Sequence, residues 1–501
     1  MSNSLNNVAI VLNSYFGPFM TEFARLLHEQ YNSRVHLYCK SDAEVEHYLN
    51  SESAALFDSV TNFMLFFPAL RDEALDKDKE LNIARDYESR MGTTYSKLSV
   101  SNRHVGKGYA LGGFNHPRSF YSGADYLHMV HAYNVQLLFW ENELINKKTD
   151  LVIADNKELA VISRMLNVPF RTMARARYKN LHYWELNEYR EAKLVQDEFN
   201  EIRKDENEAS SVTEHEKLPP YNAGKEIIKR NMQYSSFTKI LKRIGYLCLR
   251  YTYWRIRKDE KARGYFLKDQ VCSVFRQRRD ILRMSSNETV TLEELERTPF
   301  IFYPLHTEPE QSLGQISPEY FYQLEAIAAI SSNLPAGVKL VVKEVPMACG
   351  RRTDSFYEQI LLHKNVDMLN LAIPGPEVIK RALGVITIAG TAGLEAALLG
   401  KPVISFGRHN PYNFLEHVMV VKDLADLPDM IMCMIKKEIN HGQARVDANL
   451  YIQALKKVCF DMGKFDYHDL NSFSSKAPEE ALKQLCRSLG IKTNVNKVAF
   501  D

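Results

Sequence analysis

A glycine-rich turn between an apolar strand and a helix has the clearest chemical use in this sequence. Residues 384–389 form an apolar run of strand length, the turn 390–393 reads Gly-Thr-Ala-Gly, and residues 394–399 have helical composition. Such a turn leaves the first N–H groups of the helix open, with the positive end of the helix dipole behind them, which suits a phosphate. Tight strand–helix packing is the alternative use, with Glu395 as a favourable first-turn carboxylate. The candidate ligands of a phosphate and its ribose are Gly390, Thr391, Ala392, Gly393 and Glu395.

A second group of polar side chains lies in residues 103–121, a stretch too rich in glycine for a helix and too polar for a buried strand. So many donors in one loop suit a bound carboxylate or phosphate, and a histidine can move a proton near neutral pH. A polar surface loop is the alternative interpretation. The candidates for substrate binding or proton transfer are Arg103, His104, Lys107, His116 and Arg118.

Two successive strands are expected to bring charged groups to one edge of a sheet. Residues 151–154 read as a strand that ends before two carboxylates, and residues 168–173 as a strand that ends before three cations. The carboxyl ends of parallel strands meet at the same edge, so this is an active-site pattern. N-capping of the following helix by Asp155 is the structural alternative. The groups are Asp155 and Glu158 on one side, with Glu158 the favoured catalytic carboxylate, and Arg175, Arg177 and Lys179 on the other.

The elements that must position these groups alternate between strand and helix, from the apolar run 8–12 onward and again from about residue 298. This alternation predicts an α/β fold with two Rossmann-like domains that face a cleft and a helical, basic insertion between them. The predicted segments are an N-terminal acceptor domain (1–184), a helical insertion with segregated charge (185–297), a nucleotide-sugar domain (298–440) and C-terminal helices (441–501).

The composition indicates the cellular compartment of the protein and bears on a metal site and a membrane span. The 501 residues carry a formal net charge of +2 and seven scattered cysteines without a CxxC pair, which favours a reducing cytoplasm and argues against structural zinc. The N-terminus lacks the features of a signal peptide, and no window is apolar enough for a membrane span. The run Asp76-Lys77-Asp78 has the form of a metal-binding DxD, but its alternating charge favours a solvated helix face. We therefore expect no metal site.

The charge is concentrated in one segment. Between Lys225 and Asp280 there are sixteen Lys/Arg and five Asp/Glu residues, interleaved with aromatic side chains. Basic helices with aromatic residues are typical of proteins that bind anionic membrane surfaces, and this is the partner that we expect for residues 225–280. Nucleic acid is the rival partner, but no nucleic-acid-binding motif accompanies the charge. A basic insertion that folds back on the acidic segment 185–217 is the structural alternative.

Several stretches of the C-terminal half resemble the bacterial capsule and surface-polysaccharide biosynthesis glycosyltransferases, which include the β-Kdo transferases and are distantly similar to bacterial sialyltransferases. The resemblance implies a GT-B fold, a metal-independent reaction without a cofactor, and a donor site in the C-terminal domain. It assigns Gly390, Thr391 and Gly393 to the donor phosphate and Glu395 to the ribose, with Lys343, Glu344 and Pro346 at the edge of the nucleotide pocket. The stretches are 302–310, 342–346, 350–352, 355–357 and 388–407.

Val345 departs from the family pattern. Relatives usually carry a histidine there, and in the sialyltransferase-like members that histidine contacts the CMP phosphate. Valine cannot donate a hydrogen bond or carry charge, so either the donor differs or another residue takes over the contact. Both a CMP- and a UDP-linked donor therefore stay open. The candidates for the replacement are Lys343, His306 and Arg351.

The function expected from these features is glycosyl transfer from a nucleotide sugar to a surface-glycan, lipid-linked or protein acceptor, with an acidic sugar such as Kdo or a nonulosonate among the candidates. The expected place is the cytoplasm, at the inner face of the cytoplasmic membrane. A UDP-sugar 2-epimerase and a catalytically inactive glycan-assembly subunit are the alternatives. A bulky side chain at Gly393 is expected to block the phosphate and leave the fold intact.

Overall fold

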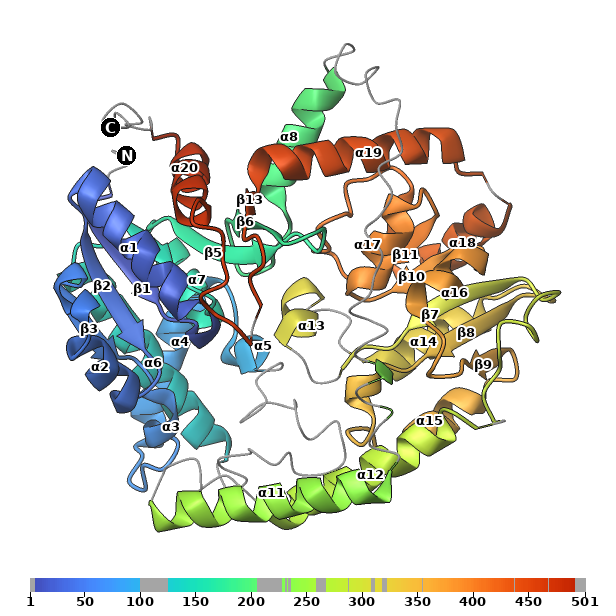
Figure 1. The fold of residues 1–501 in the computed structure, drawn as a ribbon, viewed down its shortest axis with the longest axis horizontal. Coiled ribbons are helices and arrows are strands. Elements are labelled where there is room, and N and C mark those ends of the chain that lie inside the picture. The colour runs from blue at the N-terminus through green and yellow to red at the C-terminus, as the bar shows by residue number, and fades with distance from the viewer. Residues whose placement is uncertain are drawn as a thin grey trace. The chain divides into compact units, whose positions relative to one another are not determined.

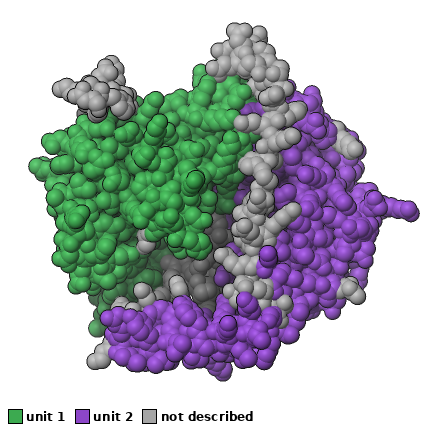
Figure 2. Space-filling view, viewed as in Figure 1, with its two compact units in different colours: residues 1–98, 124–211, 450–501 green, residues 99–123, 212–449 purple. Residues whose placement is uncertain are grey.

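The chain forms two compact units, which Figure 2 shows in different colours. In the computed structural model, residues 1–98, 124–211 and 450–501 form unit 1, and residues 99–123 and 212–449 form unit 2. The chain therefore returns to unit 1 for its last segment. The residues that the structure describes are 5–99, 125–204, 228–229, 232, 236–257, 267–286, 288–307, 311–317, 322–353, 355–436, 438–466 and 468–491.

Unit 1 is built on a seven-stranded sheet in the order β13-β6-β5-β4-β1-β2-β3 (Figure 1). The five strands from β3 to β5 pair in parallel, and β6 and β13 extend the sheet by antiparallel pairing. The parallel part has the Rossmann order, with its reversal between β1 and β4. The strands are β1 (Asn7–Val11), β2 (Arg34–Cys39), β3 (Ser59–Asn62), β4 (Leu151–Ile153), β5 (Phe170–Arg175), β6 (Leu181–Glu185) and β13 (Phe460–Asp461).

Helices cover both faces of the unit 1 sheet because its strands are apolar on both sides. On one face Ile10 and Leu37 share a core with Phe23 and Leu485, which come from α1 and α20. On the other face the Tyr38 ring packs against Trp140 of α6. The helices that contribute residues to unit 1 are α1 (Gly17–Tyr31), α2 (Asp42–Leu49), α3 (Phe66–Ala69), α4 (Lys77–Met91), α5 (Tyr95–Ser99), α6 (Tyr126–Asn146), α7 (Lys157–Met165), α8 (Lys193–Lys204), α19 (His441–Val458) and α20 (Ala477–Leu489).

Unit 2 is built on a six-stranded parallel sheet in the order β12-β11-β10-β7-β8-β9. From β7 the chain first builds outward through β8 and β9, then crosses to the other side of β7 and adds β10, β11 and β12. This is the doubly wound order with a switch point between β7 and β10. The strands are β7 (Phe300–Pro304), β8 (Lys339–Lys343), β9 (Val366–Met368), β10 (Val385–Thr387), β11 (Val403–Ser405) and β12 (Val418–Val420).

The core of unit 2 joins strand residues such as Ile301, Val342 and Ile386 to the apolar faces of helices, among them Ile327 of α14 and Ile431 of α18. The helices of unit 2 are α11 (Phe237–Ile256), α12 (Leu267–Arg283), α13 (Gln311–Ile316), α14 (Gln323–Ser332), α15 (Phe356–Leu361), α16 (Gly375–Arg381), α17 (Thr391–Leu398) and α18 (Leu427–Lys436). The two sheets confirm the predicted α/β class with two Rossmann-like domains, and α11 and α12 are the helices expected in the basic segment.

Three further predictions concern the DxD run, a metal site and a membrane-spanning helix. Asp76 is the N-cap of α4, and its carboxylate accepts the N–H groups of Asp78 and Lys79, which agrees with the helix interpretation of this DxD run. Within the described ranges, no three or more His, Cys, Asp or Glu side chains are grouped to hold a metal ion. No described helix has the length and apolar character needed to cross a membrane.

Candidate functional site

The switch point of unit 2 lies at the carboxyl ends of β7 and β10. The chain leaves these neighbouring strands in opposite directions, and in doubly wound sheets ligands bind in the crevice expected at such a point. His306 follows β7, and the turn 388–390 follows β10 and leads into α17. The turn singled out in the sequence is therefore at the place where the topology predicts a ligand.

The start of α17 is open to a ligand. Its N-cap is Gly390, which has a φ of 99° and provides no side-chain cap for the helix. Gly390, Thr391 and Ala392 are each partly exposed. The first N–H groups of a helix need partners from outside the helix, and a phosphate supplies them while it meets the positive end of the dipole. The assignment of this turn to a phosphate stays a prediction, which this geometry supports.

Gly393 points into the protein and not toward the crevice. A Cβ atom at this position would lie 2.1 Å from the Tyr412 hydroxyl oxygen and 2.8 Å from Cγ2 of Thr387. The expectation that a bulky side chain at Gly393 leaves the fold intact is therefore wrong. Glycine is required here because α17 packs closely on β10 and on the segment around Tyr412. The Gly393 N–H can still face a ligand, but its side-chain position cannot.

His306 holds the turn that leads into α17. Its Nε2 atom lies 3.1 Å from the Ala389 nitrogen and 3.2 Å from the Thr387 hydroxyl, and it also contacts the Ala389 carbonyl oxygen. Gln323 of α14 fixes the other side of the residue, since its Oε1 accepts the His306 N–H and its Nε2 donates to the His306 carbonyl. His306 is thus a buried residue that positions the turn before α17.

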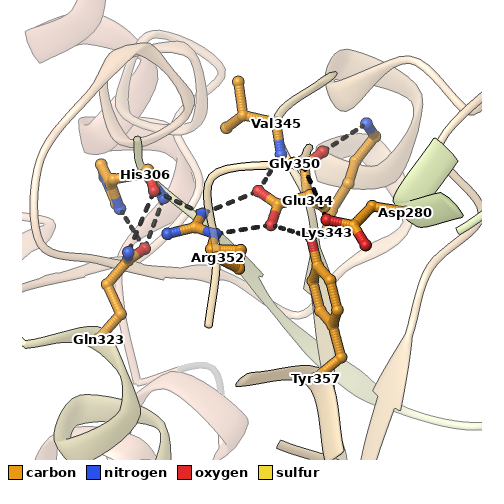
Figure 3. A network of polar contacts seen from close by, with 9 residues as sticks. All are labelled: Asp280, His306, Gln323, Lys343, Glu344, Val345, Gly350, Arg352 and Tyr357. Carbon is orange, nitrogen blue, oxygen red and sulfur yellow. Dashed lines mark hydrogen bonds and ion pairs between the residues drawn. The ribbon is translucent and has the colours of Figure 1, made fainter. Parts of the chain in front are cut away.

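A buried ion pair links this histidine to the end of β8 (Figure 3). Arg352 donates from Nε and Nη2 to the two Glu344 oxygens at 2.9 and 2.8 Å, and a second bond from Nη2 reaches the His306 carbonyl at 2.6 Å. The Tyr357 hydroxyl and the Val345 N–H also donate to Glu344. Glu344, only 1% exposed, was expected at the edge of the nucleotide pocket. Its oxygens bind protein groups, as a buried carboxylate needs several donors, and its place at the pocket edge stays a prediction.

Asp280 of α12 attaches the same loop to the basic helical segment. Its Oδ2 accepts the Gly350 N–H at 2.8 Å, and burial raises the pKa of its carboxyl group. Gly350 has a φ of 82°, and a Cβ there would lie 2.6 Å from the Gln277 nitrogen of α12. Glycine is thus required both for the backbone conformation and for the close approach of α12.

Lys343 and Val345 are the neighbours of Glu344 in the sequence, and the surroundings of their side chains differ from those of its carboxylate. The Lys343 Nζ lies 3.5 and 3.4 Å from the carbonyls of Glu344 and Leu371, and burial lowers the pKa of the amine to about 8. Pro346 is buried in a short 3-10 helix. The Val345 side chain points away from the Glu344 network (Figure 3). Of the three proposed replacements for the family histidine, His306 contacts the turn before α17.

A cavity of about 290 Å³ opens beside this network, near the lower end of the usual size of ligand pockets. Arg351 and Arg352 line it together with Gln323, the residue that holds His306. A guanidinium group at a pocket wall suits an anionic ligand. Arg351 is a predicted nucleotide ligand that lines this cavity. Glu395 is partly buried and lies in the second turn of α17, because the helix begins at Thr391, so the expectation of a first-turn carboxylate is wrong.

In unit 1 the predicted carboxylates follow β4. Asn156, and not Asp155, is the N-cap of α7, since its side chain accepts the Leu159 N–H at 2.7 Å. Asp155 forms an ion pair with Arg190 at 2.6 Å. Glu158 is half-buried in the first turn of α7, and desolvation raises the pKa of its carboxyl group. A carboxyl group with a raised pKa suits proton transfer near neutral pH.

Of the predicted cations, Arg175 is the last residue of β5, and Arg177 and Lys179 lie in the turn between β5 and β6. β4 and β5 pair in parallel, so the carboxylates and cations do follow neighbouring strand ends. Arg175, Arg177 and Lys179 are exposed, and the last two have left-handed φ values of 56° and 50°. The cation that pairs with Asp155 is Arg190, for which no sequence pattern provided a reason. Arg103, His104, Lys107, His116 and Arg118 lie outside the described residues.

Sequence reasoning also missed Glu185, the last residue of β6. Both of its oxygens accept the Ala192 N–H, and burial raises the pKa of its carboxyl group to about 7. Ala192 has a φ of 55°, so this bond stabilises an unfavourable backbone conformation. The missing signal was long-range, since the antiparallel β6 that carries Glu185 has no distinctive sequence pattern.

Residues 265–414 match the family model described as capsule polysaccharide biosynthesis protein. The match confirms the resemblance seen in the stretches between residues 302 and 407. None of the curated proteins matches this chain.

Several solved structures share a distant likeness. The KpsC β-Kdo 2,4 transferase of Thermosulfurimonas dismutans is 12% identical over 60% of this chain and 79% of its own, with a TM-score of 0.29. The KpsC β-Kdo 2,7 transferase of the same organism is 15% identical over 69% and 88%, with a TM-score of 0.29. The MnaA–UDP structure of S. aureus is 9% identical over 98% of both chains, with a TM-score of 0.29. The function proposed below does not depend on these likenesses.

Proposed function

We propose that this chain, whose residues 265–414 match the capsule polysaccharide biosynthesis family, is a metal-independent glycosyltransferase of the GT-B type. It moves a sugar from a nucleotide donor to a surface-glycan, lipid-linked or protein acceptor, and an acidic sugar such as Kdo or a nonulosonate fits the cationic residues singled out above. The place of the reaction is the cytoplasm, at the inner face of the cytoplasmic membrane.

The observation that carries this proposal is the open N-terminus of α17 at the switch point of unit 2. Gly390 leaves the helix without a side-chain cap, and His306 fixes the turn in front of it. In the proposal the donor phosphate accepts the N–H groups of residues 391–393, Glu395 binds the ribose, and Arg351 faces an anionic part of the donor. These contacts become stronger as negative charge develops on the departing phosphate, so they assist bond cleavage as well as binding.

In the proposed chemical step, Glu158 acts as the general base. Its carboxylate takes the proton from the acceptor hydroxyl, the freed oxygen attacks the anomeric carbon, and the bond from that carbon to the donor phosphate breaks, so the nucleotide leaves with the electron pair. The raised pKa of Glu158 brings it closer to the working pH, which favours proton transfer. Arg175, Arg177 and Lys179 would neutralise an acidic sugar or the departing phosphate, and His104 and His116 are the other candidates for proton transfer.

A panel of CMP-, UDP- and GDP-sugars, each incubated with and without glycan acceptors, tests this function. A transferase releases nucleotide only when an acceptor is present and lengthens that acceptor. Conversion of the nucleotide sugar without an acceptor would identify a 2-epimerase instead. Nucleotide binding with neither reaction, across acceptors of all three kinds, would favour a binding subunit and would contradict transfer.

A further inference from the structure

Helix α11 is apolar on two opposite faces. The inner face carries Ile240 and Leu247, which are buried with Val274 of the neighbouring helix α12. This contact already satisfies the apolar stripe that a surface helix needs to attach to its own protein. A second apolar stripe on the same helix therefore requires a separate explanation.

The second stripe lies on the outer face of α11. At 100° per residue these side chains fall within an arc of about 140° that is opposite Ile240. Each of them is more than half exposed, and Leu249 and Ile256 are exposed by 72% and 75%. We call this set the outer stripe: Leu241, Tyr246, Leu249, Tyr253 and Ile256.

Cations border the outer stripe, and Lys242 lies within its arc, where its long side chain can carry the ammonium group away from the apolar surface. Helix α11 contains five Lys/Arg residues, Arg257 follows its last residue, and no Asp or Glu occurs between residues 227 and 258. Helical spacing places Lys239 and Arg257 along one edge of the stripe and Arg255 near the other. The Arg257 guanidinium lies 5.3 Å from the centre of the Tyr253 ring. An apolar stripe with basic edges and aromatic rings is the design of a helix that lies in a membrane interface.

We propose that α11 lies in the plane of an anionic bilayer surface, with the outer stripe buried at the boundary of headgroups and acyl chains and the flanking cations on the lipid phosphates. The proposal rests on the proposed function only in that an acceptor at the membrane gives the attachment its use. A second copy of this chain fits the surface poorly, since face-to-face contact would bring two sets of cations together without an acid to offset them. Anionic lipid offsets the same charges.

Vesicle binding of the full chain tests this inference, with no donor or acceptor present. The vesicles contain phosphatidylcholine alone or with about one third phosphatidylglycerol, at low and high salt. The apolar variant is Leu249→Ser combined with Ile256→Ser. The matched control is Leu362→Ser, because Leu362 is 71% exposed in unit 2 but lies outside α11.

We expect the wild type and Leu362→Ser to bind anionic vesicles equally, and the double variant to bind at least about tenfold more weakly, because insertion gains free energy with each buried apolar group. A Lys239→Gln, Arg257→Gln variant should lose affinity for the anionic vesicles at low salt and lose little at high salt. Absence of binding by the wild type, or equal binding by the double variant, would overturn the proposal.

Two further readouts separate this proposal from its rivals. Sedimentation velocity that shows a dimer in the wild type and a monomer in the double variant would mean that a second copy covers the stripe, and would overturn the membrane assignment. Nucleotide affinity is measured in the same variants and should not change. A wild type that transfers sugar to a soluble acceptor but does not bind vesicles rejects the membrane helix alone, whereas a wild type that binds vesicles without any transfer rejects the proposed function alone.

Discussion

The imidazole Nε2 of His306 lies 3.1 Å from the backbone nitrogen of Ala389, so the residue after β7 holds the turn that leads from β10 into α17. The same residue is bound through its backbone by Gln323 and by Arg352. The shape of the proposed phosphate site thus depends on side chains from three other places in unit 2, and each of them can be changed separately.

Replacement of His306 by alanine should lower nucleotide affinity by about tenfold or more and destabilise the fold by about 1–3 kcal/mol, because a buried N–H loses its partner and the turn is released. Titration calorimetry and thermal unfolding measure the two effects. His417→Ala is the matched control, since His417 is also buried in unit 2 and bonds to the carbonyl of Ala397 in α17. The control should lose stability and keep its affinity; equal losses of affinity in both variants would refute the role of His306.

The Glu344→Gln variant should lower the stability of the fold more than it lowers nucleotide affinity. It removes the charge that offsets the buried Arg352 and leaves that guanidinium uncompensated, for an expected cost of about 3–5 kcal/mol. Urea unfolding measures this cost. In the Arg352→Met, Glu344→Met double variant both charges are absent, so the loss should be smaller than in the single variant. A nucleotide-affinity loss with unchanged stability would return Glu344 to the edge of the pocket.

Glu158→Gln should abolish turnover and leave nucleotide affinity unchanged, because it keeps the shape of the side chain and removes the base. In the wild type, kcat/KM should fall as the pH drops below the raised pKa of Glu158. The comparison variant is Asp155→Asn, which breaks the ion pair with Arg190 and should retain most of the activity. Near-normal turnover of Glu158→Gln would shift the search to Asp155, His104 and His116.

Glu185 predicts a pH dependence of stability. Burial raises its pKa from 4.5 to about 7, so the folded state binds this proton more tightly than the unfolded state. The stability that this proton contributes is complete below pH 4.5 and is lost as the pH rises through about 7, a change that corresponds to about 3 kcal/mol. Glu185→Gln should flatten the free energy of unfolding over this window. Denaturant unfolding at several pH values measures it, and an unchanged slope would count against the raised pKa.

Gly393→Ala should destabilise the protein by about 1–3 kcal/mol or more, because even a methyl group meets Tyr412 and Thr387 at close range. Thermal unfolding detects the loss. Gly375→Ala is the control, since no atom lies within 4 Å of a Cβ there. Similar stabilities of the two variants would restore the expectation that Gly393 faces the crevice.

The strands β1, β4 and β10 were predictable because they are buried on both faces and so read as continuous apolar runs. The bounds of β1, β4 and β10 differ by one or two residues from the predicted runs 8–12, 151–154 and 384–389. The turn at Gly390 was also predictable, because a run of small residues between an apolar strand and a helix favours a tight turn. The order of the parallel strands within each sheet then follows from the usual order of doubly wound folds.

The groups that fix the site were not predictable, because they meet only through tertiary contacts. Gln323 and His306 come from different elements, and Asp280 reaches Gly350 across 70 residues of sequence. Glu344 reads as a ligand in the sequence, and only its contacts with Arg352 show that its oxygens are already used. The orientation of Gly393 likewise depends on Tyr412, which lies beyond the next strand.

Nucleotide binding by an Ala392→Asp variant tests the central claim most directly. A carboxylate in the first turn of α17 favours the helix dipole, so the fold should be retained, but it places negative charge where the phosphate is proposed to bind. The matched control is Gly375→Asp, which puts the same charge in the first turn of α16. If the claim is correct, Ala392→Asp loses nucleotide affinity by about a hundredfold while Gly375→Asp binds like the wild type. Undiminished nucleotide affinity in a folded Ala392→Asp variant would contradict it.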